Sequence, residues 1–306
     1  MTNLKKIGLT ALAGSLAVTG FAQAGELSVN GTARMEYQSS QTSATASTDS
    51  FAQTATIVFS GSGELDNGHT VSFMQVTNSN ITSQSVKLDM GDMGTVSVAS
   101  LNLAGIGTIQ DMVPNGGEQP WDDLGTHGTP EQGVASPHGG NRLGYSVNAG
   151  VATISAAASH AFGAMTTSAA VQVSGLVDGL NVGAGVATDQ SAAGVEDDIE
   201  TYYATYTMGS VSVGMQNTTV EKTAATSDIE RDSYGVTFAV NDNFSIGYGI
   251  SETTFEALSL DEENTGIQAS YTTGGMTIGL VNNKKDNAEG ADKQMEMTEL
   301  KLTFAF

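Results

Sequence analysis

A period-two alternation of polar and apolar residues constrains the fold of this chain more than any other feature. Residues 299–306 (ELKLTFAF) place Leu or Phe at every second position and end on Phe306. Such a period is typical of a strand with one apolar and one polar face. The same pattern recurs in segment after segment back to residue 25. A long chain written in this pattern indicates a closed barrel with lipid outside and water inside.

The first 24 residues differ from everything that follows. Lys5 and Lys6 precede an apolar stretch over residues 7–22, and Ala22 and Ala24 have the spacing of a secretory cleavage site. We expect residues 1–24 to be a secretory signal peptide and residues 25–306 to form the barrel. The alternative, a transmembrane anchor helix, is disfavoured because the stretch is too short and wrongly flanked.

The composition of the remaining chain excludes several classes of protein. No later apolar run approaches the roughly 20 residues that a spanning helix needs. Without Lys5 and Lys6, 9 basic residues oppose 33 acidic ones, so the formal charge is 9 minus 33, or −24. Such a chain repels phosphate and attracts cations, which argues against a nucleic-acid partner. Cysteine is absent, so stability must come from backbone pairing and packing without disulfides.

Sixteen alternating segments can be delimited between Gly, Asn, Asp and Pro breaks. Their connections alternate between tight turns, such as residues 66–68 (DNG), and long polar stretches, such as residues 39–50. Short turns on one rim, long loops on the other and an even strand number are typical of bacterial outer-membrane barrels. We therefore predict an all-β fold, a transmembrane antiparallel β-barrel of 16 strands. The segments are residues 25–38, 51–65, 69–78, 84–90, 94–101, 141–148, 150–160, 164–174, 180–188, 200–208, 210–217, 232–240, 243–252, 265–272, 275–284 and 295–306.

Residue parity divides each segment into two faces. In the last segment Leu300, Leu302 and Phe304 share one side, and Glu299 and Lys301 share the other. We expect the apolar sides to face lipid, with tyrosines near the strand ends forming interfacial girdles. The alternative is a soluble protein whose aromatic residues are scattered through its core. Similar apolar sets are Val86, Leu88 and Met90; Leu143, Tyr145 and Val147; Tyr234, Val236, Phe238 and Val240; and Phe244, Ile246, Tyr248 and Ile250.

The third long connection, residues 102–140, is anomalous. At 39 residues it far exceeds ordinary connections, and it contains all four prolines and the only tryptophan, Trp121. A segment of this composition is expected to fold and pack, most simply inward against the barrel wall. We predict that residues 102–140 form a constriction loop, the third external loop, folded into the lumen.

The charges around this loop suggest how it would act. An acidic loop facing a basic wall would produce a transverse field that selects solutes by charge and size. The alternative is that these groups only pair with one another or solvate a wide lumen. The acidic loop residues are Asp111, Glu118, Asp122, Asp123 and Glu131. The basic residues that parity places on the inward faces are Arg34, Lys87, Arg142 and Lys301.

No catalytic motif is present. The sequence contains no GxSxG elbow, no HExxH, no phosphate-binding glycine loop and no cysteine nucleophile, so we predict that it is not an enzyme. The acidic runs at residues 196–198 and 261–263 could hold Ca²⁺ or bridge divalent ions to lipopolysaccharide. They lack EF-hand spacing, which favours solvated loops and no cofactor, with loop-bound Ca²⁺ as the alternative.

The order of several motifs resembles that of the general bacterial porin family over the whole length, and the chain is most similar to the acidic porins of marine alphaproteobacteria. The resemblance implies a homotrimer in the Gram-negative outer membrane, a water-filled pore in each protomer, an inserted third loop and a terminal strand read by the barrel-assembly machinery. The family usually pairs several arginines with loop carboxylates. Here only four inward basic residues are available, and Lys87 and Lys301 replace arginine, which favours cation preference. The motifs are residues 63–68 (GELDNG), 88–96 (LDMGDMGTV), 234–236 (YGV), 241–248 (NDNFSIGY) and 302–306 (LTFAF).

Together these observations predict an outer-membrane channel for passive diffusion of ions and small hydrophilic solutes, in contact with lipid and lipopolysaccharide and preferring cations. Two alternatives remain open at this point. An outer-membrane barrel enzyme would need an acid–base or nucleophilic group on its outer rim. A secreted β-rich adhesin or surface protein would not need detergent for extraction.

Overall fold

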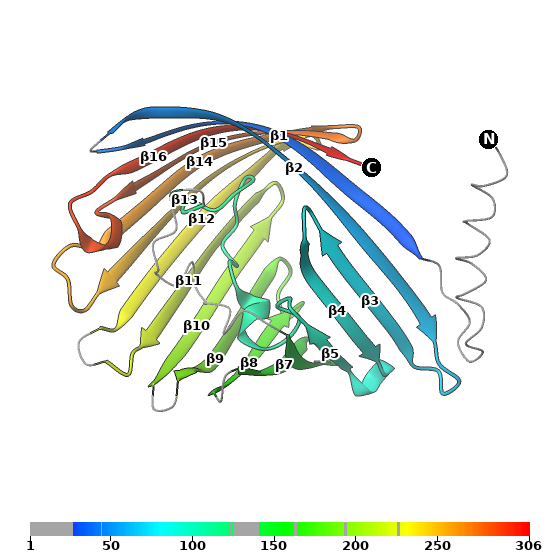
Figure 1. Ribbon diagram of the computed structural model, residues 1–306. Coiled ribbons are helices and arrows are strands. Elements are labelled where there is room, and N and C mark those ends of the chain that lie inside the picture. Colours follow the sequence, from blue (N-terminus) through cyan, green and yellow to red (C-terminus); the bar gives the residue numbers. More distant parts are fainter. Residues whose placement is uncertain are drawn as a thin grey trace, which may run out of the picture.

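The computed structural model describes residues 27–43, 45–122, 124, 141–161, 164–192, 195–224 and 227–306. They form a closed antiparallel barrel of 16 strands in which each strand pairs with its sequence neighbours and β1 pairs with β16 (Figure 1). The predicted fold class is confirmed. The segment expected to be a signal peptide, residues 1–24, lies outside the described residues.

The strands and short 3₁₀ helices follow one another in simple meander order. The strands are β1 (Ser28–Thr42), β2 (Thr45–Glu64), β3 (Thr70–Thr77), β4 (Ile81–Asp89), β5 (Thr95–Ala99), β6 (Arg142–Ala149), β7 (Ala152–Ala161), β8 (Ala164–Ser174), β9 (Leu180–Ala192), β10 (Val195–Met208), β11 (Val211–Glu221), β12 (Ile229–Asn241), β13 (Phe244–Phe255), β14 (Glu262–Thr273), β15 (Met276–Asp286) and β16 (Met295–Ala305). The 3₁₀ helices are η1 (Gly91–Met93), η2 (Gly105–Ile109) and η3 (Ala288–Gly290). In the part of the chain covered by the coordinates given above, no helix is long and apolar enough to cross a membrane.

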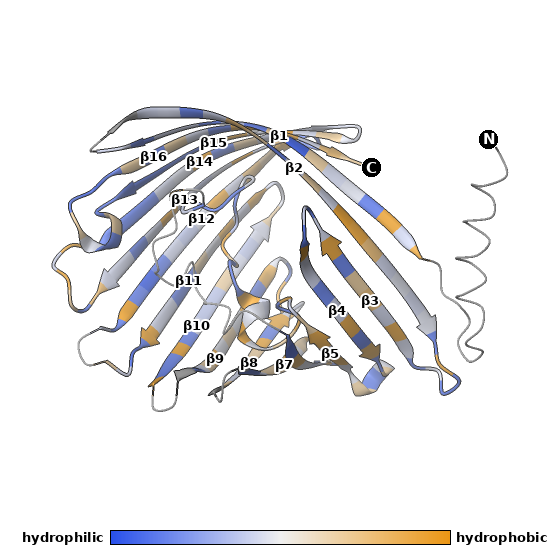
Figure 2. Ribbon diagram, viewed as in Figure 1, coloured by the Kyte–Doolittle hydropathy of each residue, from blue (hydrophilic) through white to orange (hydrophobic). Residues whose placement is uncertain are grey.

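The two faces of the sheet follow the alternation of the sequence. Ile267 on β14 is 61% exposed, whereas its neighbour Gln268 is 2% exposed, because successive side chains of a strand point to opposite faces. The same contrast separates Leu280, 52% exposed, from Val281, 2% exposed, on β15. Figure 2 shows the resulting succession of apolar and polar residues along β3, β4 and β10. The predicted apolar outer face is confirmed.

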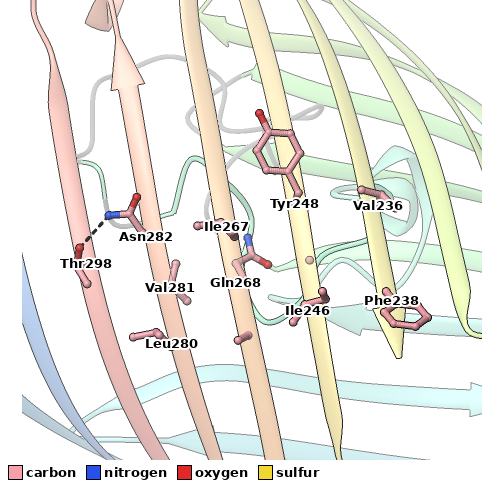
Figure 3. A pocket seen from close by; sticks show the side chains of 12 residues that line it. Val236, Phe238, Ile246, Tyr248, Ile267, Gln268, Leu280, Val281, Asn282 and Thr298 are labelled. Atoms are coloured by element: carbon pink, nitrogen blue, oxygen red, sulfur yellow. Dashed lines mark hydrogen bonds between the residues drawn. The ribbon is translucent and has the colours of Figure 1, made fainter. Parts of the chain in front are cut away.

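A shallow apolar groove lies on this outer face across β12–β16 (Figure 3). Its rim includes one polar contact, in which the Asn282 side-chain amide donates to the Thr298 hydroxyl at 2.9 Å. Because the groove opens on the apolar face, it belongs to the outer surface of the barrel and is separate from the lumen. Its outward apolar residues are Val236, Phe238, Ile246, Tyr248, Ile267 and Leu280.

Several strands extend further at the long-loop rim than the alternation predicts. Residues 39–50 were expected to be a loop, but Ser39 pairs with Asp49 in the sheet and its hydroxyl donates to the Asp49 carboxylate at 2.7 Å. Likewise, β9 continues to Ala192 and β14 begins at Glu262. These extensions carry polar residues on both faces, so the apolar period disappears while the backbone ladder continues. Alternation therefore marks the apolar band rather than the full strand length.

The turns on the opposite rim agree with the sequence. Gly68 and Gly274 adopt φ angles of 81° and 57°, which glycine tolerates without a steric penalty. Both lie in the tight turns that the sequence placed there, between β2 and β3 and between β14 and β15. Short turns therefore join the strands on this rim.

Candidate functional site: a segment bound to the inner wall

The segment from residue 102 to residue 122 lies inside the barrel (Figure 1). At one end the backbone amide of Ile106 donates to the Ser168 hydroxyl on β8 at 3.3 Å. At the other end Asn283 on β15 donates to the carbonyl of Gln119 at 3.0 Å. A segment of this length can reach both strands only across the lumen-facing surface of a closed barrel.

Helix η2 anchors the start of the segment through apolar packing. Ile106 and Ile109 are 0% exposed and pack against side chains that project inward from β8–β11. Burying an apolar side chain of this size stabilises the packed arrangement of the segment on the wall by roughly 1.5–3 kcal/mol. The apolar wall residues are Ala170, Ala187, Ile199, Tyr203 and Val220.

Three amide side chains of the wall bind the backbone of the segment further along. Gln216 on β11 accepts from the Met112 amide at 2.8 Å and donates to the Ile109 carbonyl at 2.9 Å. Gln268 on β14 accepts from the Gly116 amide at 2.7 Å. Asn283 contributes a second bond, to the Asp122 carbonyl at 3.2 Å. These bonds satisfy backbone groups that would otherwise be buried without partners.

These three amides were not identified from the sequence. The signal that could have identified them is their type, because Gln and Asn both donate and accept. Their partners are remote in sequence and follow only from the fold.

The predicted acidic loop residues have different surroundings. Glu118 forms an ion pair with Lys301 on β16, and Asp122 accepts from the Gln119 amide at 2.9 Å. Asp111 is exposed and has a positive φ of 51°. The other two predicted residues, Asp123 and Glu131, lie outside the described residues.

The predicted basic residues all lie on inward faces but do not gather at one place. Lys301 lies opposite Glu36 in the β1–β16 register, and the Arg34 side chain is 3.0 Å from the Glu36 carboxylate. Lys87 lies opposite Ser72 and Ser97 on β3 and β5. Arg142 on β6 is 7% exposed and donates to the Asn102 side chain at the start of the segment. Glu118 therefore meets one of the four basic residues, Lys301.

A second charged cluster lies at the long-loop end of the inner wall. Glu262 is 1% exposed; its carboxylate is 3.4 Å from the Lys285 ammonium and 4.0 Å from the Arg231 guanidinium, and it accepts from the Glu289 amide at 3.0 Å. Sequence reasoning missed Arg231 and Lys285 because it placed both in loops. The available signal was the parity of Glu262 with Asn264 and Gln268 on β14.

Three carboxylates in the two acidic runs considered for Ca²⁺ are engaged by protein groups. Asp197 lies 2.9 Å from the Lys222 ammonium, and Asp198 accepts from the Thr188 hydroxyl at 3.0 Å. Glu262 is held in the cluster described above. Over the residues whose positions are given, no group of three or more His, Cys, Asp or Glu side chains could hold a metal ion.

Comparison with known proteins agrees with this architecture. The profile of the Gram-negative porin family matches residues 8–295. A porin structure refined at 1.8 Å resolution superposes with a TM-score of 0.71 at 17% identity, covering 92% of this chain and 100% of that one. A mutant of the Rh. blastica porin gives 0.68 at 14% identity, with 92% and 100% covered. A loop deletion mutant of OmpT, an outer membrane protein of Vibrio cholerae, gives 0.67 at 13%, with 93% and 100% covered.

None of the curated protein sequences matches this chain. The profile match nevertheless spans nearly the whole sequence. This chain therefore belongs to the Gram-negative porin family, whose members are channel proteins of the outer membrane and not enzymes.

Proposed function

We propose that this porin passes ions and small hydrophilic solutes by passive diffusion and prefers cations. The supporting observation is the surroundings of Lys301, whose ammonium group faces the carboxylates of both Glu118 and Glu299, the latter at 2.6 Å. With the neighbouring Glu36 and Arg34, three carboxylates thus accompany two positive charges where the inserted segment approaches β16. A net negative lining attracts cations and repels anions.

We further propose that residues 102–140 form the constriction. The acidic side of the passage would consist of Asp111, Glu118, Asp122, Asp123 and Glu131. The basic side would consist of Arg34, Lys87, Arg142 and Lys301. The position of residues 102–122 inside the barrel supports this role, since any segment there reduces the free cross-section.

Membership of the porin family supports the following proposal for the assembly. Residues 1–24 act as a secretory signal, the mature barrel forms a homotrimer, and the barrel-assembly machinery reads the C-terminal aromatic strand. Outer-membrane lipid and lipopolysaccharide contact the apolar outer face. Passive diffusion requires no cofactor, and bound Ca²⁺ is not part of the proposal.

The experiment that tests cation preference is a reversal-potential measurement in planar bilayers under a KCl gradient. The parent protein is expected to give the sign for a K⁺-selective channel at low salt. Neutralising Asp122 and Asp123 together (Asp122→Asn with Asp123→Asn) should move the potential toward zero. A parent reversal potential at zero, or one of the opposite sign, would refute the preference.

A further inference from the structure

Four glycines form a continuous belt across β11–β14. Gly214 pairs with Gly235, Gly235 pairs with Gly249, and Gly249 pairs with Gly266 in the sheet register. Glycine inside a strand weakens the strand and often marks a place where another backbone approaches closely. Four in register at one level of the barrel indicate such an approach.

The inserted segment occupies this belt through two of its prolines. A Cβ atom added to Gly214 would lie 2.5 Å from the Pro114 ring, and one added to Gly235 would lie closer still to the Pro114 carbonyl oxygen. The second proline, Pro120, has the same relation to the other half of the belt. Added Cβ atoms on Gly249 and Gly266 would lie 2.6 Å from its Cγ and 2.9 Å from its Cα, respectively.

These distances leave no room for a side chain in the belt. Non-bonded carbon atoms prefer separations of about 3.5–4.0 Å. Proline is stiff because its ring fixes φ, so Pro114 and Pro120 cannot easily bend away. Any larger residue in the belt must push the segment off the wall.

Amide side chains hold the segment at both ends of the belt. Asn283 pairs with Gly266 in the register and binds the carbonyl of Gln119. Gln216 lies two residues beyond Gly214 on the same inward face and binds Met112. The four glycines of the belt, together with Gln216 and Asn283, therefore form the wall surface to which the inserted segment binds. We call this surface the seat.

The exposure of inner-wall side chains shows which part of the wall the bound segment covers and which part stays open to the lumen. Gln268 on β14 is 2% exposed and Asn283 on β15 is 0% exposed, and both bind the segment that covers the wall there. On β1 the inward Arg34 side chain is 40% exposed. Among the described residues, the accessible part of the inner wall thus includes β1, while the belt side is covered.

We propose that Gly214, Gly235, Gly249 and Gly266 determine the size limit of the pore by letting residues 113–120 lie flat against the β11–β14 wall. This inference rests on the proposed diffusion function and specifies which residues set the free cross-section of the pore. Enlarging a belt residue displaces the segment toward the lumen and narrows the passage. The glycines themselves touch no solute; they act by positioning the segment.

The test compares Gly235→Ala and Gly249→Ala with Gly279→Ala. Gly279 also faces inward, but a Cβ there would lie 3.7 Å from the Lys301 Cβ, an ordinary contact. The belt variants should show lower single-channel conductance than Gly279→Ala, which should match the parent protein. Heat-modifiable electrophoretic mobility confirms that each variant is a folded barrel. Equal or higher conductance in folded belt variants would overturn the inference.

A second readout does not depend on conduction. Trp121 is the only tryptophan of the chain and is 7% exposed in the inserted segment. In detergent, displacement of the segment should make Trp121 more accessible to acrylamide quenching in the belt variants than in Gly279→Ala. Equal Trp121 quenching in the belt variants and in Gly279→Ala would refute the inference even where no current is measured. A parent protein that fails to conduct, with quenching as expected, refutes only the diffusion function.

A variant that adds no volume to the belt tests the inference if the belt variants do not fold. Gln268→Leu keeps nearly the same volume but removes the bonds to Gly116 and Glu118. The segment should loosen, which raises Trp121 quenching and the current noise of the open channel. Parent-like noise and quenching would contradict the proposed seat.

Discussion

The ammonium group of Lys301 on β16 and the carboxylate of Glu118 form an ion pair that joins the last strand of the barrel to the inserted segment. Both groups are largely buried, with side-chain exposures of 10% and 15%. Glu299 lies on the same inward face and is 0% exposed. The pair therefore belongs to a small charged cluster whose balance depends on each member.

Removing one carboxylate from this cluster should weaken the cation preference. A single charge about 4 Å from a permeating ion contributes about 1 kcal/mol in water, so Glu118→Gln should lower the K⁺/Cl⁻ permeability ratio by up to about fivefold. Reversal potentials measure the ratio directly. Glu118→Asp keeps the charge and serves as the control, which should stay close to the parent. A ratio that rises in Glu118→Gln would contradict this account.

The cation preference should also fall with salt. Exposed charges are screened over a Debye length of about 10 Å at 0.1 M ionic strength and about 3 Å at 1 M. As the salt concentration rises from about 0.1 M to about 1 M, we expect the K⁺/Cl⁻ permeability ratio to fall toward the ratio for free diffusion. A ratio independent of salt would mean that selection comes from size rather than charge.

Packing of η2 on the inner wall should contribute strongly to stability. Ile109→Ala removes a side chain that is 0% exposed, and substitutions of this kind cost about 2–5 kcal/mol. The free energy of unfolding, measured by urea titration in lipid vesicles, should fall accordingly. Ile154→Ala is the control, because this outward Ile is 49% exposed and lipid can replace its lost contacts. Equal losses in both variants would argue against the inner core.

The free-energy cost of a charged residue on the outer face should depend on its depth in the membrane. Ile267 lies near the middle of β14, where Ile267→Arg should destabilise the barrel in bilayers by about 2–4 kcal/mol. Thr273→Arg, on the same face at the end of the strand, should cost about 0–1 kcal/mol. Vesicle unfolding titrations compare the two. Similar costs would mean that the two positions do not differ in membrane depth.

Chelation should leave the purified channel unchanged. The carboxylates of Asp197 and Glu262 are occupied by Lys222 and Lys285, so no divalent ion is needed to balance them. In phosphatidylcholine bilayers, EDTA should alter neither the conductance nor the unfolding midpoint. A lower midpoint that Ca²⁺ alone restores would reveal a structural calcium site.

The sequence predicts the barrel well because its main signal is local. Alternation identifies a strand wherever its two faces meet lipid and water, and parity alone placed Arg34, Lys87, Arg142 and Lys301 on the inner face. The same rule fails at the long-loop rim. There both faces are polar, so Arg231 and Lys285 were assigned to loops although they end up buried beside Glu262.

The seat of the inserted segment could not be predicted, since it depends on contacts between remote residues. The proline content of residues 102–140 and the tryptophan indicated a packed loop. Nothing in the local sequence shows that Pro114 would lie over Gly235, or that Gln268 would bind Gly116. These contacts exist only after the sheet has brought β11–β14 into register.

The pairing of β1 with β16 has a consequence for biogenesis. Most other strand pairs join sequence neighbours through short connections, with β5 and β6 as the exception because residues 100–141 separate them. The β1–β16 seam spans the greatest sequence distance of all and is therefore slow to form. Until β16 arrives, the nascent sheet exposes two unpaired edges that invite aggregation. A barrel whose seam is still open is therefore prone to aggregate, and the β1–β16 pairing removes both exposed edges at once.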